Sequence, residues 1–454
     1  MPFRFLVLQW PRAARLPLPT LTLPKTQANP LTPEGLDGYT RHYRGSSRTA
    51  DGRKQTVAHT ALGAYDRDRF SLEDNRGQIF QRRTAIPEFL YPGVYVEEVE
   101  LGPRPIEGVP TSTAGFVGLT QKGPKISSLI TSFADYVNLF GCHLPVDVST
   151  LPYAVEGFFK NGGKGCYIAR VDEKSDYTSA LEQLEGIEDV SIVVAPDHHR
   201  DPDLAAEIVK HCERLQDRFA ILHAPPGVHL VTKIEQFKPP VDTKFAAFYF
   251  PWINVTDPAT EKDVLIPPSG HVAGIYARVD IGRGVFSGPA NEVVLGANSL
   301  ETNITDVQQQ VLNPQGVNCI RQFPGRGIRV WGARTCSTDP EWKYVNVRRY
   351  LTYLEQSIQE GTEWAVFEPN EPQLWATVRN TISAFLIKEW HRGGLVGITP
   401  EEAFFVKVDQ SIMTPDDILN GRLIILIGVA PLRPAEFVIF RIGQWTADAH
   451  ICDP

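Results

Sequence analysis

Hydrophobic and polar positions follow two patterns along the chain. Between about residues 115 and 255, short and nearly continuous apolar runs alternate with segments in which apolar residues recur at helical spacing. The runs are CYIARV after Gly165, VSIVV from Val190, AILH from Ala220 and FAAFYF from Phe245, and the helical segments span 152–160, 177–184 and 204–215. Continuous apolar strands separated by helices are typical of a largely parallel sheet covered on both faces. The pattern predicts a Rossmann-like α/β domain.

The last third of the chain predicts a C-terminal α+β domain. Helices are expected over 347–360 and 372–391, each followed by glycine, and the apolar residues of the second fall on one face. After Phe404 come three strand segments: FVKVD, RLIILIGV from Arg422, and AEFVIFRI over 435–442. Together they predict an antiparallel sheet.

The first 114 residues differ from the rest. Residues 1–85 are rich in proline and arginine and hold 14 Lys or Arg against 7 Asp or Glu, about +7, which leaves 31 against 46, about −15, for the remaining chain. We expect this leader to be poorly ordered. Residues 86–114 predict an extended arm with a short strand at 94–99. The expected division is therefore 1–85, 86–114, 115–299 and 300–454.

Bulk charge and cysteine content exclude several classes of protein. A net charge of −8 over 454 residues argues against general affinity for nucleic acid. The six cysteines form no CxxC pair, so neither a zinc site nor a disulfide framework is expected, and assembly in a reducing cytoplasm is favoured. The longest apolar runs, such as 423–429, are too short to cross a bilayer as a helix, so no direct membrane insertion is expected.

The sequence carries no recognised motif for catalysis or cofactor binding. The glycines from Gly157 to Gly165 approach P-loop spacing, but Gly163 stands where the lysine belongs and no Ser or Thr follows Lys164. Asp197, His198 and His199 could be imagined as metal ligands, yet a solvated loop at the carboxyl end of a strand is the simpler interpretation. The prediction is no catalytic residue, no cofactor and no metal, hence no enzyme.

Four stretches resemble the tail sheath family of contractile phages and phage-tail-like contractile injection systems. They are YPGVYVEEVELGPRPIEGVPTSTAGFVG from Tyr91, VEGFFKNGGKGCYIARV from Val155, PPSGHVAGIYARVD from Pro267 and WKYVNVRRYLTYLEQSI from Trp342, in the family's order. The resemblance covers roughly residues 86–445. It implies a sheath-type fold and a structural subunit that stacks in hexameric rings around an inner tube. Such a sheath contracts to drive the tube through a target envelope, with baseplate and cap proteins as further partners.

The resemblance also implies arm strands that cross to neighbouring subunits. Carried over to this sequence, their residues are Val94, Tyr95, Val96 and Val99 in the N-terminal arm and Phe437, Val438, Phe440 and Ile442 near the C-terminus. The alternative is that either strand completes the sheet of its own domain. The connector over 103–110 is then the expected hinge.

A tube contact is implied for the helix that opens with Lys343, Arg348 and Arg349. Because Val347, Leu351 and Leu354 occupy its apolar face, both arginines are expected to project outward, either toward acidic groups of the tube or simply into solvent.

Other interpretations stay open. The first 85 residues depart from the family pattern, and they can be a decorating arm, a disordered tail or an extension absent from the mature protein. The role can be that of a specialised variant at the baseplate or cap. A nucleotide- or metal-dependent enzyme on the α/β domain is the rival from another class. Whether the particle is released or membrane-anchored is open.

Overall fold

A computed structural model describes residues 4–9, 105–173, 176–201, 203–228 and 234–439. The short strand β1 (Arg4–Gln9) and the described residues from 105 onward belong to one compact unit. Predictions that concern residues 10–104, including the strand at 94–99, lie outside the described residues.

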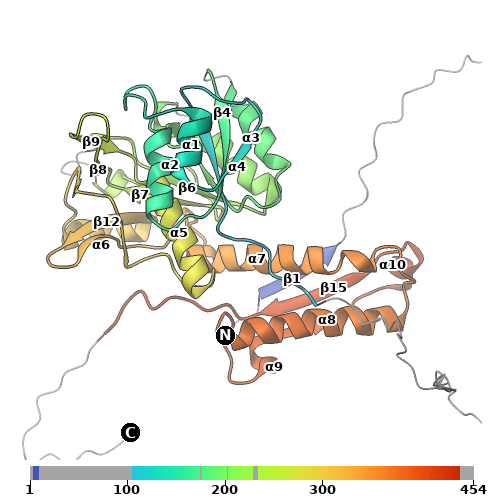
Figure 1. Ribbon diagram of the computed structural model, residues 1–454. Coiled ribbons are helices and arrows are strands. Elements are labelled where there is room, and N and C mark those ends of the chain that lie inside the picture. The colour runs from blue at the N-terminus through green and yellow to red at the C-terminus, as the bar shows by residue number, and fades with distance from the viewer. Residues whose placement is uncertain (1–3, 10–104, 174–175, 202, 229–233, 440–454) are drawn as a thin grey trace, which may run out of the picture. The chain divides into compact units, whose positions relative to one another are not determined.

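The largest element is a nine-stranded sheet with a parallel centre (Figure 1). Its strand order is β10-β13-β12-β7-β6-β5-β2-β4-β3. The strands are β2 (Ala114–Leu119), β3 (Ser128–Ile130), β4 (Cys166–Val171), β5 (Ile192–Val194), β6 (Phe219–His223), β7 (Ala246–Phe250), β10 (Glu292–Val293), β12 (Val317–Phe323) and β13 (Gly327–Val330). The pairs from β4 through β12 are parallel, whereas β3, β13 and β10 join antiparallel at the edges.

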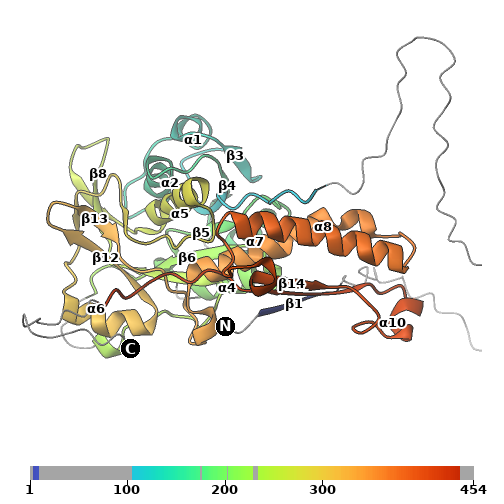
Figure 2. The same cartoon turned by 90° about the horizontal axis from the view of Figure 1, so that it is seen from below.

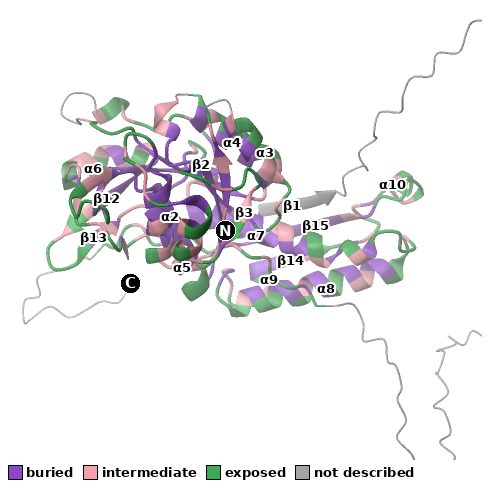
Figure 3. Ribbon diagram, turned by 45° about the horizontal axis from the view of Figure 1, so that its top comes forward, coloured by how far each residue is buried: buried purple, intermediate pink, exposed green. Residues whose placement is uncertain are grey.

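Helices cover both faces of this sheet, which explains its continuous apolar strands. One apolar cluster lies under α1 (Phe133–Phe140), α2 (Leu151–Lys160) and α5 (Ser269–Arg283), and another under α3 (Tyr177–Glu185) and α4 (Leu204–Leu215). Figure 3 shows buried residues where helices meet the sheet and exposed ones on the outer helix faces. The sequence-predicted α/β domain is confirmed.

Glycines let α2 and α5 approach closely. A Cβ atom at Gly270 would lie 2.3 Å from the carbonyl oxygen of Ala154, and one at Gly274 would lie 2.3 Å from that of Phe158. Both distances are far below van der Waals contact, so only glycine fits. The close contact leaves α5 buried on most sides, so its sequence lacks the one-sided apolar pattern of a surface helix.

The C-terminal domain packs two long helices on one face of a small antiparallel sheet (Figure 2). The helices are α7 (Val345–Gly361) and α8 (Pro372–His391). The sheet has the order β1-β15-β14, with β15 (Ile424–Val429) between β1 and β14 (Phe404–Lys407). The predicted α+β domain is thus confirmed. The pairing of β1 with β15, from Arg4 opposite Val429 to Gln9 opposite Ile424, was not predicted.

Smaller elements complete the unit. A three-stranded sheet contains β11 (Ser299–Leu300), β8 (Ile253–Thr256) and β9 (Asp263–Ile266), and short helices are α6 (Asp306–Leu312), α9 (Pro400–Ala403) and α10 (Pro415–Leu419). Because β12 and β13 pair into the large sheet, the expected boundary between residues 299 and 300 falls inside the α/β domain. The apolar period that signals a strand does not reveal which sheet the strand joins.

Candidate functional site at helix α7

Helix α7 holds the ends of two chain segments that lead out of the described fold. The N-terminal arm root, residues 105–113, lies along the helix from its carboxyl end toward its middle. The C-terminal arm root, residues 431–439, meets the start of the helix. At about 1.5 Å per residue, the 17 residues of α7 separate its two ends by about 25 Å.

The N-terminal arm root is fixed by packing and hydrogen bonds. Ile106 is 4% exposed and lies close to Gly361. A Cβ atom added at Gly361 would be 2.5 Å from Cγ1 of Ile106. The Val109 amide donates to Ser357 Oγ at 3.1 Å. Gly108 is pressed on Tyr353, where a Cβ would lie 2.1 Å from the phenol oxygen. The described part of the expected hinge at 103–110 is therefore clamped to α7.

A buried ion pair joins this root to both domains. Arg349 of α7 donates to the two carboxylate oxygens of Asp280 of α5 at 3.0 and 2.6 Å, and to the carbonyl of Thr111 at 2.8 Å. The side chains are 4% and 2% exposed. Burial raises the pKa of Asp280, and the charge of Arg349 opposes that rise. One guanidinium group thus connects the α/β domain, α7 and the arm root.

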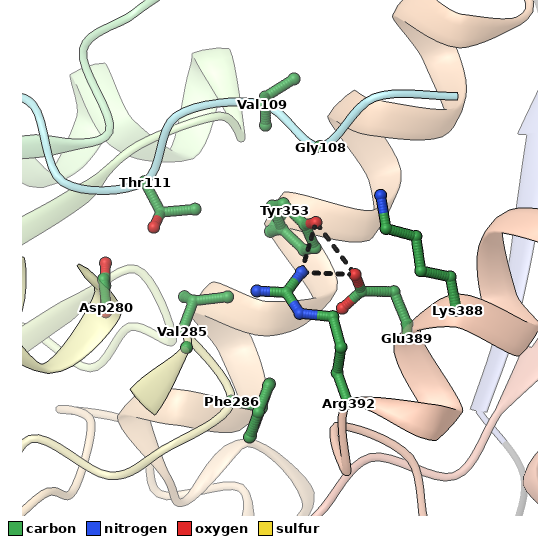
Figure 4. A pocket seen from close by; sticks show the side chains of 11 residues that line it. Gly108, Val109, Thr111, Asp280, Val285, Phe286, Tyr353, Lys388, Glu389 and Arg392 are labelled. Carbon is green, nitrogen blue, oxygen red and sulfur yellow. Dashed lines mark hydrogen bonds and ion pairs between the residues drawn. The ribbon is translucent and has the colours of Figure 1, made fainter. Parts of the chain in front are cut away.

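A cavity of about 210 Å³ lies between this root, α7 and α8 (Figure 4). Its wall includes Glu389, 1% exposed, which accepts hydrogen bonds from Tyr353 at 3.2 Å and from Arg392 at 2.7 Å. Burial raises the pKa of Tyr353 to about 12, and the charge of Glu389 adds to the rise. The network satisfies a buried carboxylate and ties α8 to α7.

Glu436 fixes the C-terminal arm root. Its carboxylate accepts two hydrogen bonds from Arg334, at 2.7 and 2.8 Å, and one each from Asn313 at 2.8 Å and Tyr344 at 3.0 Å. Lys343 lies 3.1 Å away as a second cation. Partial burial alone would raise the pKa of Glu436, but the bonds from Arg334 and Asn313 outweigh it and lower the pKa to about 2.

Beyond Glu436 the chain carries apolar side chains into solvent. Phe437, Val438 and Ile439 are 69%, 71% and 80% exposed. Residues 431–439 form no ladder with the domain's own sheet, so the alternative in which this segment completes that sheet fails for the described part. Phe440 and Ile442, like Val94, Tyr95, Val96 and Val99, lie outside the described residues, and the pairing of these strands with a neighbour stays a prediction.

The expected outward orientation of Arg348 and Arg349 is wrong. Both arginine side chains are 4% exposed. Arg348 donates to Glu355 at 2.9 Å and stacks on Trp342, 4.6 Å from the ring centre. Lys343 keeps 31% of its side chain exposed beside Glu436. The expectation failed because helical spacing assigns charged residues to solvent, whereas Glu355 of the same helix pairs with Arg348 and Asp280 of α5 pairs with Arg349 inside the fold.

The other candidate residues have structural partners. Asp197 and His198 follow β5 as expected, but they are 5% and 4% exposed, so the solvated-loop interpretation is wrong. Asp197 accepts hydrogen bonds from Ser149 and Thr150, at 3.0 and 2.9 Å, and joins two loops. Of the glycines from 157 to 165, Gly157 faces His271 and Gly163 faces Phe158, which are packing roles.

The described ranges show neither a metal site nor a membrane helix. In them no three His, Cys, Asp or Glu side chains gather as metal ligands would. Likewise, no helix within residues that the structure describes combines the length and apolarity of a membrane span.

The sequence did not single out Glu436 or Asp280. Glu436 stands in an apolar segment, and Asp280 ends a stretch that carries the family resemblance but gives no sign of a partner for its carboxylate. The available signal was the carboxylate of Glu436 inside the otherwise apolar pattern AEFVIF. A carboxylate in such a pattern is rarely buried without a partner.

Comparisons with known proteins give one consistent result. The family model described as phage tail sheath protein central domain matches residues 172–336, and the model of the phage tail sheath C-terminal domain matches 337–444. A prophage major tail sheath protein of Pseudomonas aeruginosa is 23% identical over 394 residues, covering 78% of this chain and 97% of the relative.

Solved structures are more similar still. The contracted PVC sheath complex of an extracellular contractile injection system is 32% identical, with a TM-score of 0.68 over 78% of this chain and 97% of that chain. A chain of the anti-feeding prophage baseplate, 6-fold symmetrised, is 31% identical, with a TM-score of 0.66 over 78% of this chain and 99% of that chain.

Proposed function

The chain belongs to the phage tail sheath family, and from that premise we propose that its two arm roots link it to neighbouring copies in a contractile sheath. The protein is a structural sheath subunit of a contractile injection system, part of a phage-tail-like particle. We propose in addition that the two arms keep neighbouring subunits connected while the subunit bodies move.

One observation carries this proposal. The C-terminal arm root is fixed at Glu436, yet the residues directly after it expose three consecutive apolar side chains. An exposed apolar segment with strand-forming sequence favours addition to a sheet edge of another chain. Phe437, Val438, Phe440 and Ile442 would supply that strand, and Val94, Tyr95, Val96 and Val99 its counterpart at the other end.

The proposed assembly is a stack of hexameric rings around an inner tube, which shortens to drive the tube outward. Backbone hydrogen bonds of the added strands persist while side-chain contacts between subunit bodies change. Contraction of this kind is a switch between two packings and needs no nucleotide. Accordingly, we propose no catalytic role for the chain. We also propose that the particles assemble in the cytoplasm.

For the tube contact, Lys343 is the member of the predicted set Lys343, Arg348 and Arg349 that keeps substantial exposure. We retain it as a contact to acidic tube residues. The two buried arginines support that face from within.

A second candidate role is at the baseplate, because one similar chain stands in the anti-feeding prophage baseplate structure. A subunit of the bulk lattice polymerises without limit, whereas a baseplate variant stops at closed rings.

The test is negative-stain electron microscopy of the full chain, expressed alone and with its genomic neighbours, beside a variant that ends at Glu436. Long striated cylinders from the full chain, and dispersed folded subunits from the shortened one, are expected. Cylinders from both would reject the arm proposal, and closed rings from the full chain would favour the baseplate role. A thermal shift on adding ATP or Mg²⁺ would reopen the enzyme alternative.

A further inference from the structure

We infer that sheath subunits make a head-to-tail contact in which the exposed Phe367 of one copy enters a groove beside the arginine-rich β12–β13 hairpin of the next. The inference rests on the proposed self-assembly and adds a specific surface on each side. Its two halves lie at opposite ends of α7.

Phe367 is the most exposed large apolar side chain in the described residues, at 101% of its reference area. Its backbone has φ 70°, a left-handed conformation that costs a bulky residue about 1–2 kcal/mol. It stands in the loop between α7 and α8, where the Val366 side chain beside it is also exposed, at 43%. Exposure of an aromatic ring on strained backbone favours a binding role over a folding role.

Carboxylates surround this ring. Glu363, Glu368 and Glu371 are exposed and make no ion pair within the part of the chain that the structure describes. Burial raises the pKa of the neighbouring Glu360, and the charges of Glu188, Glu363 and Asp189 add to the rise. The tip therefore carries uncompensated negative charge around an apolar centre.

The hairpin has the complementary character. Arg326 lies over both Phe323 and Trp331, 5.4 and 5.7 Å from the ring centres. Arg326 and Arg329 donate to the neutral side chain of Asn291, at 3.1 and 3.4 Å, and neither forms an ion pair inside the described ranges. Two cations, of which Arg326 lies over aromatic rings, are thus held in place without a counter-charge, in a chain whose net charge is −8.

A groove of about 830 Å³ opens beside this hairpin. Trp331, Ala333 and Pro434 give it apolar walls, and Tyr344 lines it just before α7 begins. A ring that enters this groove would bring its flanking carboxylates toward the hairpin arginines, so apolar burial and charge pairing act together.

The placement on α7 decides the symmetry of the contact. The groove adjoins the amino end of the helix, and Phe367 follows its carboxyl end, about 25 Å away. Two different surfaces that bind each other form a heterologous contact, which generates rings or helical filaments instead of closed dimers. The same contact also brings the N-terminal arm root of one copy, which ends at Ile106 beside Gly361, near the C-terminal arm root of the next.

The first test uses Phe367→Gly in the full chain. Glycine removes the ring and relieves the left-handed backbone, so the folded subunit should keep or gain thermal stability. We expect the critical concentration for sheath assembly, followed by light scattering and electron microscopy, to rise at least about tenfold. The matched control is Gln216→Gly, which relieves an exposed residue with φ 61° elsewhere and should leave assembly unchanged.

The second test reverses charge. The variant R326E/R329E should impair assembly, whereas K164E/K210E, two exposed lysines away from both surfaces, should not. A chain that carries R326E/R329E together with E363K/E368K presents complementary surfaces again and should recover assembly. Normal assembly of both F367G and R326E/R329E would overturn the inference. A wild-type chain that forms no sheath at all would instead count against the proposed function.

Discussion

Removal of the Arg349 guanidinium should destabilise the subunit without touching any exposed surface. In Arg349→Met the side-chain volume is roughly kept, but Asp280, 2% exposed, loses its ion pair, and the Thr111 carbonyl loses its donor. Breaking a buried pair by removing one partner costs about 3–5 kcal/mol. In a unit of more than 250 residues this corresponds to a fall of about 5–10 °C in melting temperature.

The pH dependence of this variant has a definite sign. Burial already raises the pKa of Asp280, and loss of Arg349 removes the opposing charge. An acid whose pKa is higher in the folded state binds more protons there, so stability falls as pH rises through that pKa. The deficit of Arg349→Met relative to wild type should therefore be larger at pH 7 than at pH 5.

Two comparisons separate this cause from others. The control Arg422→Met removes an exposed arginine, 49% accessible, from ion pairs with Asp416 and Asp417, and should cost at most about 1 kcal/mol. The double variant D280L/R349M removes both charges and should recover much of the loss. The reasoning is refuted if Arg349→Met melts within about 1 °C of wild type, or if the double variant is less stable than the single one.

Three further predictions follow from packing and charge. Glu436→Gln keeps the shape of the side chain but loses its charge, so amide hydrogen exchange over 431–439 should accelerate about tenfold to a hundredfold. Acidification of the wild-type protein toward pH 2 protonates Glu436 and should accelerate exchange in the same segment. Unchanged exchange rates would contradict this prediction. Gly274→Ala forces a Cβ against the Phe158 carbonyl and should lower the melting temperature, whereas Gly186→Ala, with open space around it, should not. Burial lowers the pKa of His198 and His271 to about 4, so the unfolded chain binds more protons below pH 6.5 and thermal stability should fall from pH 6.5 toward 4; a flat profile would argue against their burial.

The elements and their class could be predicted from periodicity, because buried parallel strands and capped helices leave local signals. The runs after Gly165 and from Val190 became β4 and β5, and the helix over 372–391 was expected with its observed limits. Pairing between strands that are far apart in the sequence leaves no such local signal. The entry of β12 into the large sheet and the pairing of β1 with β15 depend on contacts between residues far apart in sequence.

The candidate site was harder to predict for the same reason. Arg348 and Arg349 were expected in solvent because helical spacing places them beside polar positions. Arg348 is paired with Glu355 of the same helix, and Arg349 is paired with Asp280 of α5. The second partner is far away in sequence, so a local pattern does not reveal it. The role of Glu436 likewise depends on Arg334, 102 residues away.

The attachment of both arm roots to α7 has a mechanical consequence. Tension that enters near Ile106 meets α7 at its carboxyl end, and tension on the C-terminal segment meets Glu436 beside the amino end. A pull between neighbouring subunits would then run along the axis of one helix, parallel to its hydrogen bonds, instead of peeling strands from a sheet edge. Part of such a load would also reach the nine-stranded sheet, because Arg334, which holds Glu436, is hydrogen-bonded to Asn318 of β12.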